Sequence, residues 1–190
     1  MLQFIQNLKQ YDILISNFLF HIRNGYLINI FLLITNLVNP LVVAILTILF
    51  IASTIFLKQK RFIIPMILSI LFAVTSANVL KIIFERLRPS VGYYLETGFS
   101  FPSAHSTVAV AFYGFIIYFL LSNIKTLKNK FLVVILFPIL ILLIGFSRMY
   151  LGVHYLTDVV GGFLLGGICL YSSIFIFKAF FYKKRNKVSK

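Results

Sequence analysis

Long apolar runs alternate with short polar turns along most of this chain, and the pattern predicts membrane helices. A helix needs about 20 apolar residues to cross a bilayer core of roughly 30 Å, and each run is close to that length. We predict five membrane-spanning helices, at residues 40–57, 62–84, 103–121, 131–147 and 155–177. The expected fold class is all-α, a polytopic membrane helix bundle that forms a single domain over residues 1–190.

The N-terminal segment has a different pattern. Residues 10–24 place polar side chains at helical spacing among Ile, Leu and Phe: Asp12, Ser16, Asn17, His21 and Asn24. This narrow polar stripe predicts an amphipathic helix that lies in the membrane interface and ends at Gly25. If residues 11–37 instead contain an additional span, the bundle has six membrane helices.

Composition supports a membrane protein, because 61% of the residues are hydrophobic and the mean hydropathy is +1.01. The formal charge is +14, but the basic residues lie in short turns between apolar runs, which argues against nucleic-acid binding. Cys169 is the only cysteine, so no internal disulfide can form. The first ten residues lack the basic-then-apolar order of a cleavable signal peptide.

The basic residues also predict an orientation. Twelve lie on one side of the predicted spans: Lys58, Lys60, Arg61, Lys125, Lys128, Lys130, and Lys178, Lys183, Lys184, Arg185, Lys187 and Lys190 of a basic tail at residues 178–190. The positive-inside rule places this side in the cytoplasm. The opposite side, with six basic residues, then faces the extracytoplasmic space of the cell membrane.

Three polar fragments interrupt the apolar pattern on that outer side, and their patterns are K-x6-RP, PSAH and SR-x5-H-x3-D. They are the segment from Lys81 to Pro89, the segment from Pro102 to His105, and the segment from Ser147 to Asp158. The first closes the second predicted span, the second opens the third, and the third bridges the last two. We therefore expect all three fragments to meet at one membrane face.

Lys81 and Arg88 are seven residues apart, nearly two helical turns, so we predict that they share a helix face and that the helix ends just before Pro89. Two converging cations are suited to binding a phosphate. The alternative is a pair of side chains that extend to the membrane surface without binding a ligand.

Pro102-Ser103-Ala104-His105 reads as a helix start with Ser103 at the N-cap. The free backbone N–H groups and the helix dipole at such an end attract an anion, and His105 in the first turn can reach it. An ordinary capped helix with a histidine at the interface is the alternative for this fragment taken alone.

His154 and Asp158 are four residues apart, so on a helix the carboxylate can reach an imidazole nitrogen. Such a histidine can attack phosphorus, with Arg148 neutralising the phosphoryl oxygens. A buried polar pair that only aids packing is the alternative. Two histidines and an aspartate can also bind Zn²⁺, but the cations around them would repel a metal, so no metal is expected.

Together, the three fragments resemble the motifs of the type 2 phosphatidic acid phosphatase (PAP2) family of membrane phosphatases. The resemblance implies a metal-independent, cofactor-free, two-step reaction in which His154 is the nucleophile, Asp158 orients it and His105 is the general acid. The implied phosphate ligands are Lys81, Arg88, Ser103, Ala104, Ser147 and Arg148. Soluble acid phosphatases and vanadate-dependent haloperoxidases share these motifs, but five predicted spans argue against both.

The resemblance implies a phosphorylated lipid as substrate: undecaprenyl diphosphate, phosphatidylglycerophosphate or phosphatidic acid, as for small bacterial members of the family. The motifs do not distinguish these lipids and do not set an oligomeric state. Ala104 replaces the glycine that is usual in the family, which adds a methyl group beside the phosphate but keeps the N–H. A non-catalytic lipid-binding or lipid-transport protein is the alternative function.

Two further features have simple interpretations. Gly162 and Gly166 have the spacing of close helix packing within the last span. The loop at residues 90–101, which contains Tyr93, Tyr94 and Glu96, is expected to be a passive connector rather than a part of the substrate entrance.

Overall fold

The computed structural model describes the backbone of residues 2–188 and the side chains of residues 6–179. Within that part of the chain all regular secondary structure is helical, which confirms the predicted all-α bundle. Its elements are α1 (Leu2–His21), α2 (Gly25–Asn36), α3 (Pro40–Phe56), the 3-10 turn η1 (Lys60–Phe62), α4 (Ile63–Phe84), α5 (Ala104–Asn123), α6 (Leu127–Tyr150) and α7 (Leu156–Val188).

Four helical segments of the described chain are long and apolar enough to cross a membrane: Lys60–Phe84, Ala104–Asn123, Leu127–Tyr150 and Leu156–Ala179. The predicted span at residues 40–57 corresponds to α3, which alone has only 17 residues. It joins α2 at a bend of 47°, and the two together make a fifth candidate span. The break follows from Asn39, whose side chain caps α3, and from Pro40 at the first helical position.

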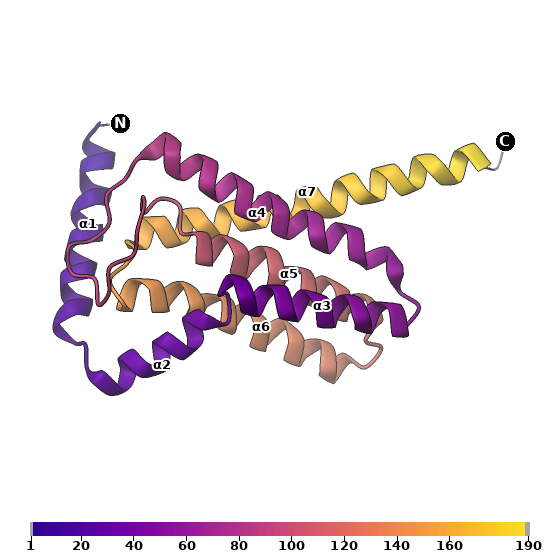
Figure 1. Cartoon of the computed structure of the whole chain (residues 1–190), viewed down its shortest axis with the longest axis horizontal. Helices are drawn as coiled ribbons and strands as arrows, with labels where there is room; N and C mark the ends of the chain where they lie inside the picture. Colours follow the sequence, from indigo (N-terminus) through magenta and orange to yellow (C-terminus); the bar gives the residue numbers. More distant parts are fainter. Residues whose placement is uncertain (1, 189–190) are drawn as a thin grey trace.

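α5 is the central helix of the bundle and packs against α4, α6 and α7 (Figure 1). Its side chains are buried on most sides, with Ala109, Ala111 and Phe115 fully inaccessible. α7 lies very close to α5 at two glycines, Gly162 and Gly166, as their spacing in the sequence predicts. A Cβ atom on Gly162 would lie 2.6 Å from the carbonyl oxygen of Ser103, and one on Gly166 would lie 2.4 Å from that of Thr107.

α1 lies across one end of the bundle, nearly perpendicular to the long helices (Figure 1), and contacts α6 and α7. This is the orientation expected of a helix in the membrane interface. Its predicted boundaries at residues 10–24 are wrong, since α1 begins at Leu2 and ends at His21. Gly25 starts α2 instead of ending α1, because the side chain of Asn24 accepts a hydrogen bond from the backbone of Leu27 and caps α2.

Other helix ends also differ from their predicted positions. α4 ends at Phe84, where Glu85 adopts a left-handed conformation with φ of 45°, so the prediction that the helix continues to Pro89 is wrong. α6 extends to Tyr150 and therefore includes Arg148 in its last turn. α7 continues through most of the predicted tail at residues 178–190, while residues 189–190 and the side chains of residues 180–190 lie outside the described part.

Candidate active site

The three sequence fragments meet at the end of the bundle that α1 covers (Figure 1). α4 and α6 end there, α5 and α7 begin there, and the loops at residues 85–103 and 151–155 connect them. The centre of the group is buried, because Arg148 is 1% exposed, His154 2% and Asp158 0%. The structure thus gathers residues that are far apart in the chain into one polar cluster.

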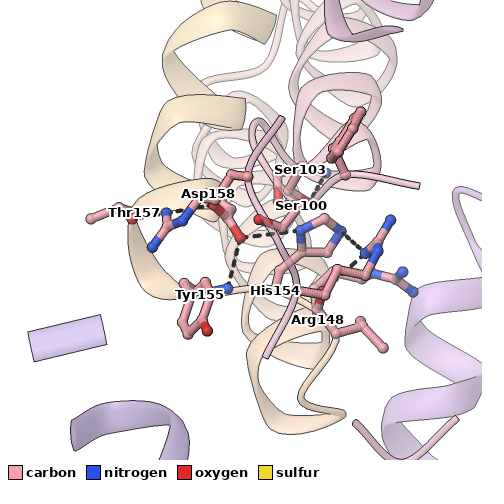
Figure 2. Close-up of polar contacts among 12 residues, drawn as sticks. Ser100, Ser103, Arg148, His154, Tyr155, Thr157 and Asp158 are labelled. Atoms are coloured by element: carbon pink, nitrogen blue, oxygen red, sulfur yellow. Dashed lines mark hydrogen bonds and ion pairs between the residues drawn. The ribbon is translucent and has the colours of Figure 1, made fainter. Parts of the chain in front are cut away.

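His154 lies between a carboxylate and a guanidinium. Its Nδ1 is 3.5 Å from Oδ2 of Asp158, an ion-pair distance that exceeds an ordinary N–H···O hydrogen bond (Figure 2). Its Nε2 is 3.1 Å from Nη1 of Arg88. Because an arginine can only donate, we assign the proton to Nδ1, and the unprotonated Nε2 accepts from Arg88.

The charge state of His154 follows from its surroundings. Burial, together with the positive charges of Arg148 and Arg88, holds the pKa of His154 well below its usual range. The imidazole is therefore neutral at neutral pH. A neutral ring with an unprotonated Nε2 is the form that a nucleophilic histidine needs.

Two arginines lie near His154. Arg88 donates from Nη1 to the carbonyl of Val153 at 2.9 Å and from Nε to that of Gly98 at 3.0 Å. Arg148 donates from Nη1 to the hydroxyls of Thr35 at 2.9 Å and Tyr94 at 2.7 Å. Within the described part of the chain, Nε of Arg148 is buried without a hydrogen-bond partner. A buried donor without an acceptor is costly, so this atom is available to an anionic ligand.

Lys81 and His105 complete the predicted set. The ammonium of Lys81, on the last turn of α4, donates to the carbonyl of Phe99. Its charge interacts with those of Arg88 and Arg148. His105, in the first turn of α5, lies within electrostatic range of His154 and of these three cations. Because α4 ends at Phe84, Arg88 reaches the site from the loop, and the prediction that Lys81 and Arg88 share a helix face is wrong.

Glu96 lies among these cations, although the sequence analysis expected its loop to be a passive connector. Its carboxylate accepts a hydrogen bond from Nη2 of Arg148 and lies 3.3 Å from Nη2 of Arg88. Burial opposes ionisation, but Arg148 and Arg88 outweigh it and lower the pKa of Glu96 below its usual range. The chain has only four acidic residues, and a carboxylate in a loop between two basic motifs was the signal for this contact.

The start of α5 has the predicted cap. Oγ of Ser103 accepts hydrogen bonds from the backbone N–H of Ser106 at 3.4 Å and from its hydroxyl at 3.0 Å. The N–H of Ser103 donates to the carbonyl of Asp158 at 3.0 Å, which fixes the start of α5 against α7. Ala104 is the first residue of α5, where backbone N–H groups have no partner inside the helix.

Ser147 is fully buried one residue before Arg148. Its hydroxyl donates to the carbonyl of Ile144 at 2.6 Å, so its proton is used within α6. Its oxygen lone pairs can still accept a hydrogen bond, but the hydroxyl is not a free donor. The structure therefore supports a phosphate contact less for Ser147 than for Arg148.

A second polar network, absent from the sequence analysis, lies behind Asp158. Nη1 of Arg86 donates to Oδ1 of Asp158 at 2.7 Å and to the hydroxyl of Thr157 at 2.6 Å, while Nη2 donates to Oδ2 of Asp12 at 2.6 Å. Oδ1 of Asp12 accepts from the backbone N–H of Thr157 at 3.0 Å. Asp12 was placed on the polar stripe of the interfacial helix, but its partners lie 74 and 145 positions away in sequence.

A cavity of about 650 Å³ opens between α1 and the loop after α4. Its polar lining includes Lys9, Arg86 and Arg88, and Ile13 and Leu87 contribute apolar walls. Arg88 lines this cavity and also contacts His154, so it links the cavity to the buried cluster.

Among residues 6–179, no group of three or more His, Cys, Asp or Glu side chains forms a possible metal site. The buried cluster contains three basic side chains beside its two histidines, a set that suits an anion rather than a divalent cation. The expectation of a reaction without metal or cofactor stays a prediction.

Comparison with known proteins gives the class of the chain. Residues 62–185 match the PAP2 superfamily, and the chain belongs to that family. A crystal structure described as the first transmembrane PAP2 type phosphatidylglycerolphosphate phosphatase from Bacillus subtilis superposes with a TM-score of 0.81 and 35% sequence identity. That match covers 92% of this chain and 86% of the other. Together with the apolar helices, it makes this a multi-pass membrane protein.

Two curated relatives are similar over shorter regions. Phosphatidylglycerophosphatase B of Bacillus subtilis (strain 168) is 47% identical over 91 residues, which are 47% of this chain and 45% of that protein. An undecaprenyl-diphosphatase of Sulfolobus acidocaldarius is 32% identical over 131 residues, which are 63% of this chain and 57% of that protein. The chain thus spans about half the length of the curated relatives it matches.

Proposed function

We propose that this protein is an integral-membrane lipid phosphatase that hydrolyses a lipid phosphate or diphosphate through a phosphohistidine intermediate. The observation that carries the proposal is the state of His154, a neutral imidazole whose unprotonated Nε2 faces the guanidinium of Arg88. Membership of the PAP2 superfamily and the names of the matched relatives, two phosphatases and a diphosphatase, support the same reaction class.

In the first step, the Nε2 lone pair of His154 attacks phosphorus and the bond from phosphorus to the lipid oxygen breaks. His105 donates a proton to the leaving oxygen, so the lipid departs as an alcohol or, from a diphosphate, as a monophosphate. Asp158 stabilises the positive charge that develops on the imidazole ring of His154.

In the second step, water attacks phosphorus on the phosphohistidine and gives its proton to His105. The bond between phosphorus and Nε2 breaks, inorganic phosphate leaves, and His154 returns to its neutral form. Cations around the phosphoryl oxygens stabilise the charge in both steps. The proposed phosphate ligands are Lys81, Arg88, Arg148, Ser103 and Ser147, with the backbone N–H of Ala104.

The buried Nε of Arg148 supports a phosphate ligand at this position. That donor lacks a partner within the described residues, and a phosphoryl oxygen would supply the acceptor. The carboxylate of Glu96 forms ion pairs with both Arg148 and Arg88. A phosphate that binds to both guanidiniums therefore replaces the carboxylate of Glu96.

Phosphatidylglycerophosphate, phosphatidic acid and undecaprenyl diphosphate are the substrates that we propose to test. All three are anionic, and the cavity beside Arg88 combines cationic and apolar walls, as a phosphorylated lipid requires. The twelve basic residues that the sequence puts on the other side of the predicted spans favour a cytoplasmic location for that side. The site would then face the extracytoplasmic side of the cell membrane.

The test is phosphate release by the purified protein in detergent, with each of these lipids and with EDTA present. We expect turnover by the wild type, inhibition by vanadate, and loss of turnover in His154→Ala. His21→Ala is the matched control, because His21 is exposed at the end of α1. Activity that requires a divalent metal, or that survives in His154→Ala, would contradict the mechanism. Binding of lipid without turnover would favour the lipid-transport alternative.

A further inference from the structure

Arg86 bridges two buried carboxylates. Asp158 on α7 is 0% exposed and Asp12 on α1 is 2% exposed, and the guanidinium contacts both at 2.6 to 2.7 Å. The chain contains only four acidic residues, and two of them meet at this arginine. Since buried carboxylates are unfavourable without a cation, the positive charge of Arg86 stabilises the burial of both.

The contacts of Arg86 argue against a direct role in binding phosphate. Both terminal nitrogens already donate to carboxylates, and Nη1 also donates to the hydroxyl of Thr157. The guanidinium lies over the ring of Tyr155, with Cζ 4.4 Å from the ring centroid. By contrast, Arg148 retains a buried N–H without a partner among the described residues.

Asp158 is held on both of its oxygens. Oδ1 accepts from Arg86, while Oδ2 accepts from the backbone N–H of Tyr155 at 2.9 Å and faces Nδ1 of His154. Arg86 therefore fixes the plane of the carboxylate that orients the proposed nucleophile. Asp12 in turn holds Arg86 and the backbone N–H of Thr157, the neighbour of Asp158 in the first turn of α7.

We infer that Arg86 is a positioning residue for Asp158, and that Asp12 fixes Arg86, so that the N-terminal helix α1 is coupled to the nucleophile His154. The inference rests on the proposed function for its kinetic consequences. Its structural basis is the chain of contacts from Asp12 through Arg86 and Asp158 to His154.

Loss of Arg86 has a specific expected effect on the pH profile. A buried carboxylate without its cation takes up a proton more readily, and a protonated Asp158 cannot stabilise positive charge on His154. Other groups that face Asp158 stay in place: Lys81 from α4, Arg88 from the loop and Tyr155 beside it, besides His154. The fall of kcat at low pH, the acid limb of the profile, should therefore begin at a higher pH. The limb itself should remain, because these other groups still act on Asp158.

The experiment compares Arg86→Gln, Arg86→Lys and Asp12→Asn with the wild type, measuring kcat and KM for lipid phosphate hydrolysis from pH 5 to 9. We expect Arg86→Gln to lower kcat at neutral pH by roughly tenfold or more with little change in KM, and to shift the acid limb upward. Arg86→Lys should restore part of both effects. Asp12→Asn should act in the same direction but more weakly.

Two control variants separate this effect from general damage. Arg61→Gln makes the same change at the opposite end of the bundle, and Glu85→Gln matches the loss of charge in Asp12→Asn. Both should retain the wild-type profile. A uniform loss of kcat with an unmoved acid limb would overturn the inference, and so would a raised KM with unchanged kcat, which would make Arg86 a substrate ligand.

A measurement without turnover distinguishes failure of this inference from failure of the proposed function. The chain has only three histidines, so ¹⁵N-histidine spectra can be assigned with single His→Gln variants. We expect the Nδ1–H tautomer for His154 in the wild type and a changed chemical shift of that Nδ1 in Arg86→Gln, because the carboxylate that faces it loses its cation, even if none of the lipids is hydrolysed. An unchanged chemical shift of His154 Nδ1 in folded Arg86→Gln and Asp12→Asn protein would overturn the inference.

Discussion

The guanidinium of Arg148 donates to the carboxylate of Glu96, a residue of the loop that covers the site. The carboxylate of Glu96 thus pairs with an arginine that we propose as a ligand of the substrate phosphate. Glu96→Gln removes this competing charge, so we expect KM and the vanadate inhibition constant to fall by roughly three- to tenfold, which corresponds to about 1 kcal/mol. Steady-state kinetics measures both. Glu85→Gln is the control, and a rise in KM would show that Glu96 assists binding instead.

The buried state of His154 predicts how stability depends on pH. Its folded-state pKa lies well below the unfolded value of about 6.5, so the unfolded state binds more protons below that pH. The stability that neutral His154 contributes is present above about pH 6.5 and is lost as the pH falls below it. Thermal unfolding in detergent should therefore show a smaller loss of stability between pH 7 and pH 5 in His154→Gln than in the wild type. An equal loss in both proteins would contradict the assigned neutral state.

His105 should matter most for poor leaving groups. As the proposed general acid, it protonates the lipid oxygen, so His105→Gln should lower kcat for a lipid phosphate by about 10²- to 10⁴-fold. With p-nitrophenyl phosphate, whose leaving group needs no proton, the loss should be much smaller. Comparing kcat for the two substrates in the variant and the wild type tests this. Equal losses would assign His105 to phosphate binding rather than proton transfer.

Two adjacent glycines provide a matched test of helix packing. A Cβ atom on Gly166 would lie 2.4 Å from the carbonyl oxygen of Thr107, whereas one on Gly167 would meet nothing within 4 Å. We expect Gly166→Ala to destabilise the protein by about 1 to 3 kcal/mol because α5 and α7 must separate. Gly167→Ala should be neutral or slightly stabilising, since alanine favours helix. Thermal unfolding in one detergent compares them, and equal melting temperatures would contradict the packing argument.

The sequence predicts that the three fragments meet. Successive membrane helices run in opposite directions, so every second connection lies at the same face of the membrane. The same logic fails where the backbone departs from a helix. Glu85 adopts a left-handed conformation that ends α4 early, and this conformation brings Arg88 to His154 through a loop rather than along a helix face. The prediction from the spacing of Lys81 and Arg88 assumed that the helix continued through Glu85.

Contacts between segments that are distant in sequence explain why the sequence did not predict the roles of Asp12 and Glu96. Asp12 belongs to a polar stripe that periodicity assigns to the membrane surface, yet it is 2% exposed because Arg86 and Thr157 surround it. No spacing rule connects residues so far apart. Glu96 lies in a loop without periodicity, so only the scarcity of acidic residues pointed to it.

Close contact between α5 and α7 has a consequence for the precision of the site. Gly162 lets the two main chains touch beside Ser103, and the N–H of Ser103 donates to the carbonyl of Asp158. The spacing between the helix that carries His105 and the helix that carries Asp158 is therefore set by main-chain contacts and is insensitive to side-chain rotamers. The proposed reacting groups rest on a rigid frame, so we expect the loop at residues 85–103, rather than the helices, to adapt to different lipids.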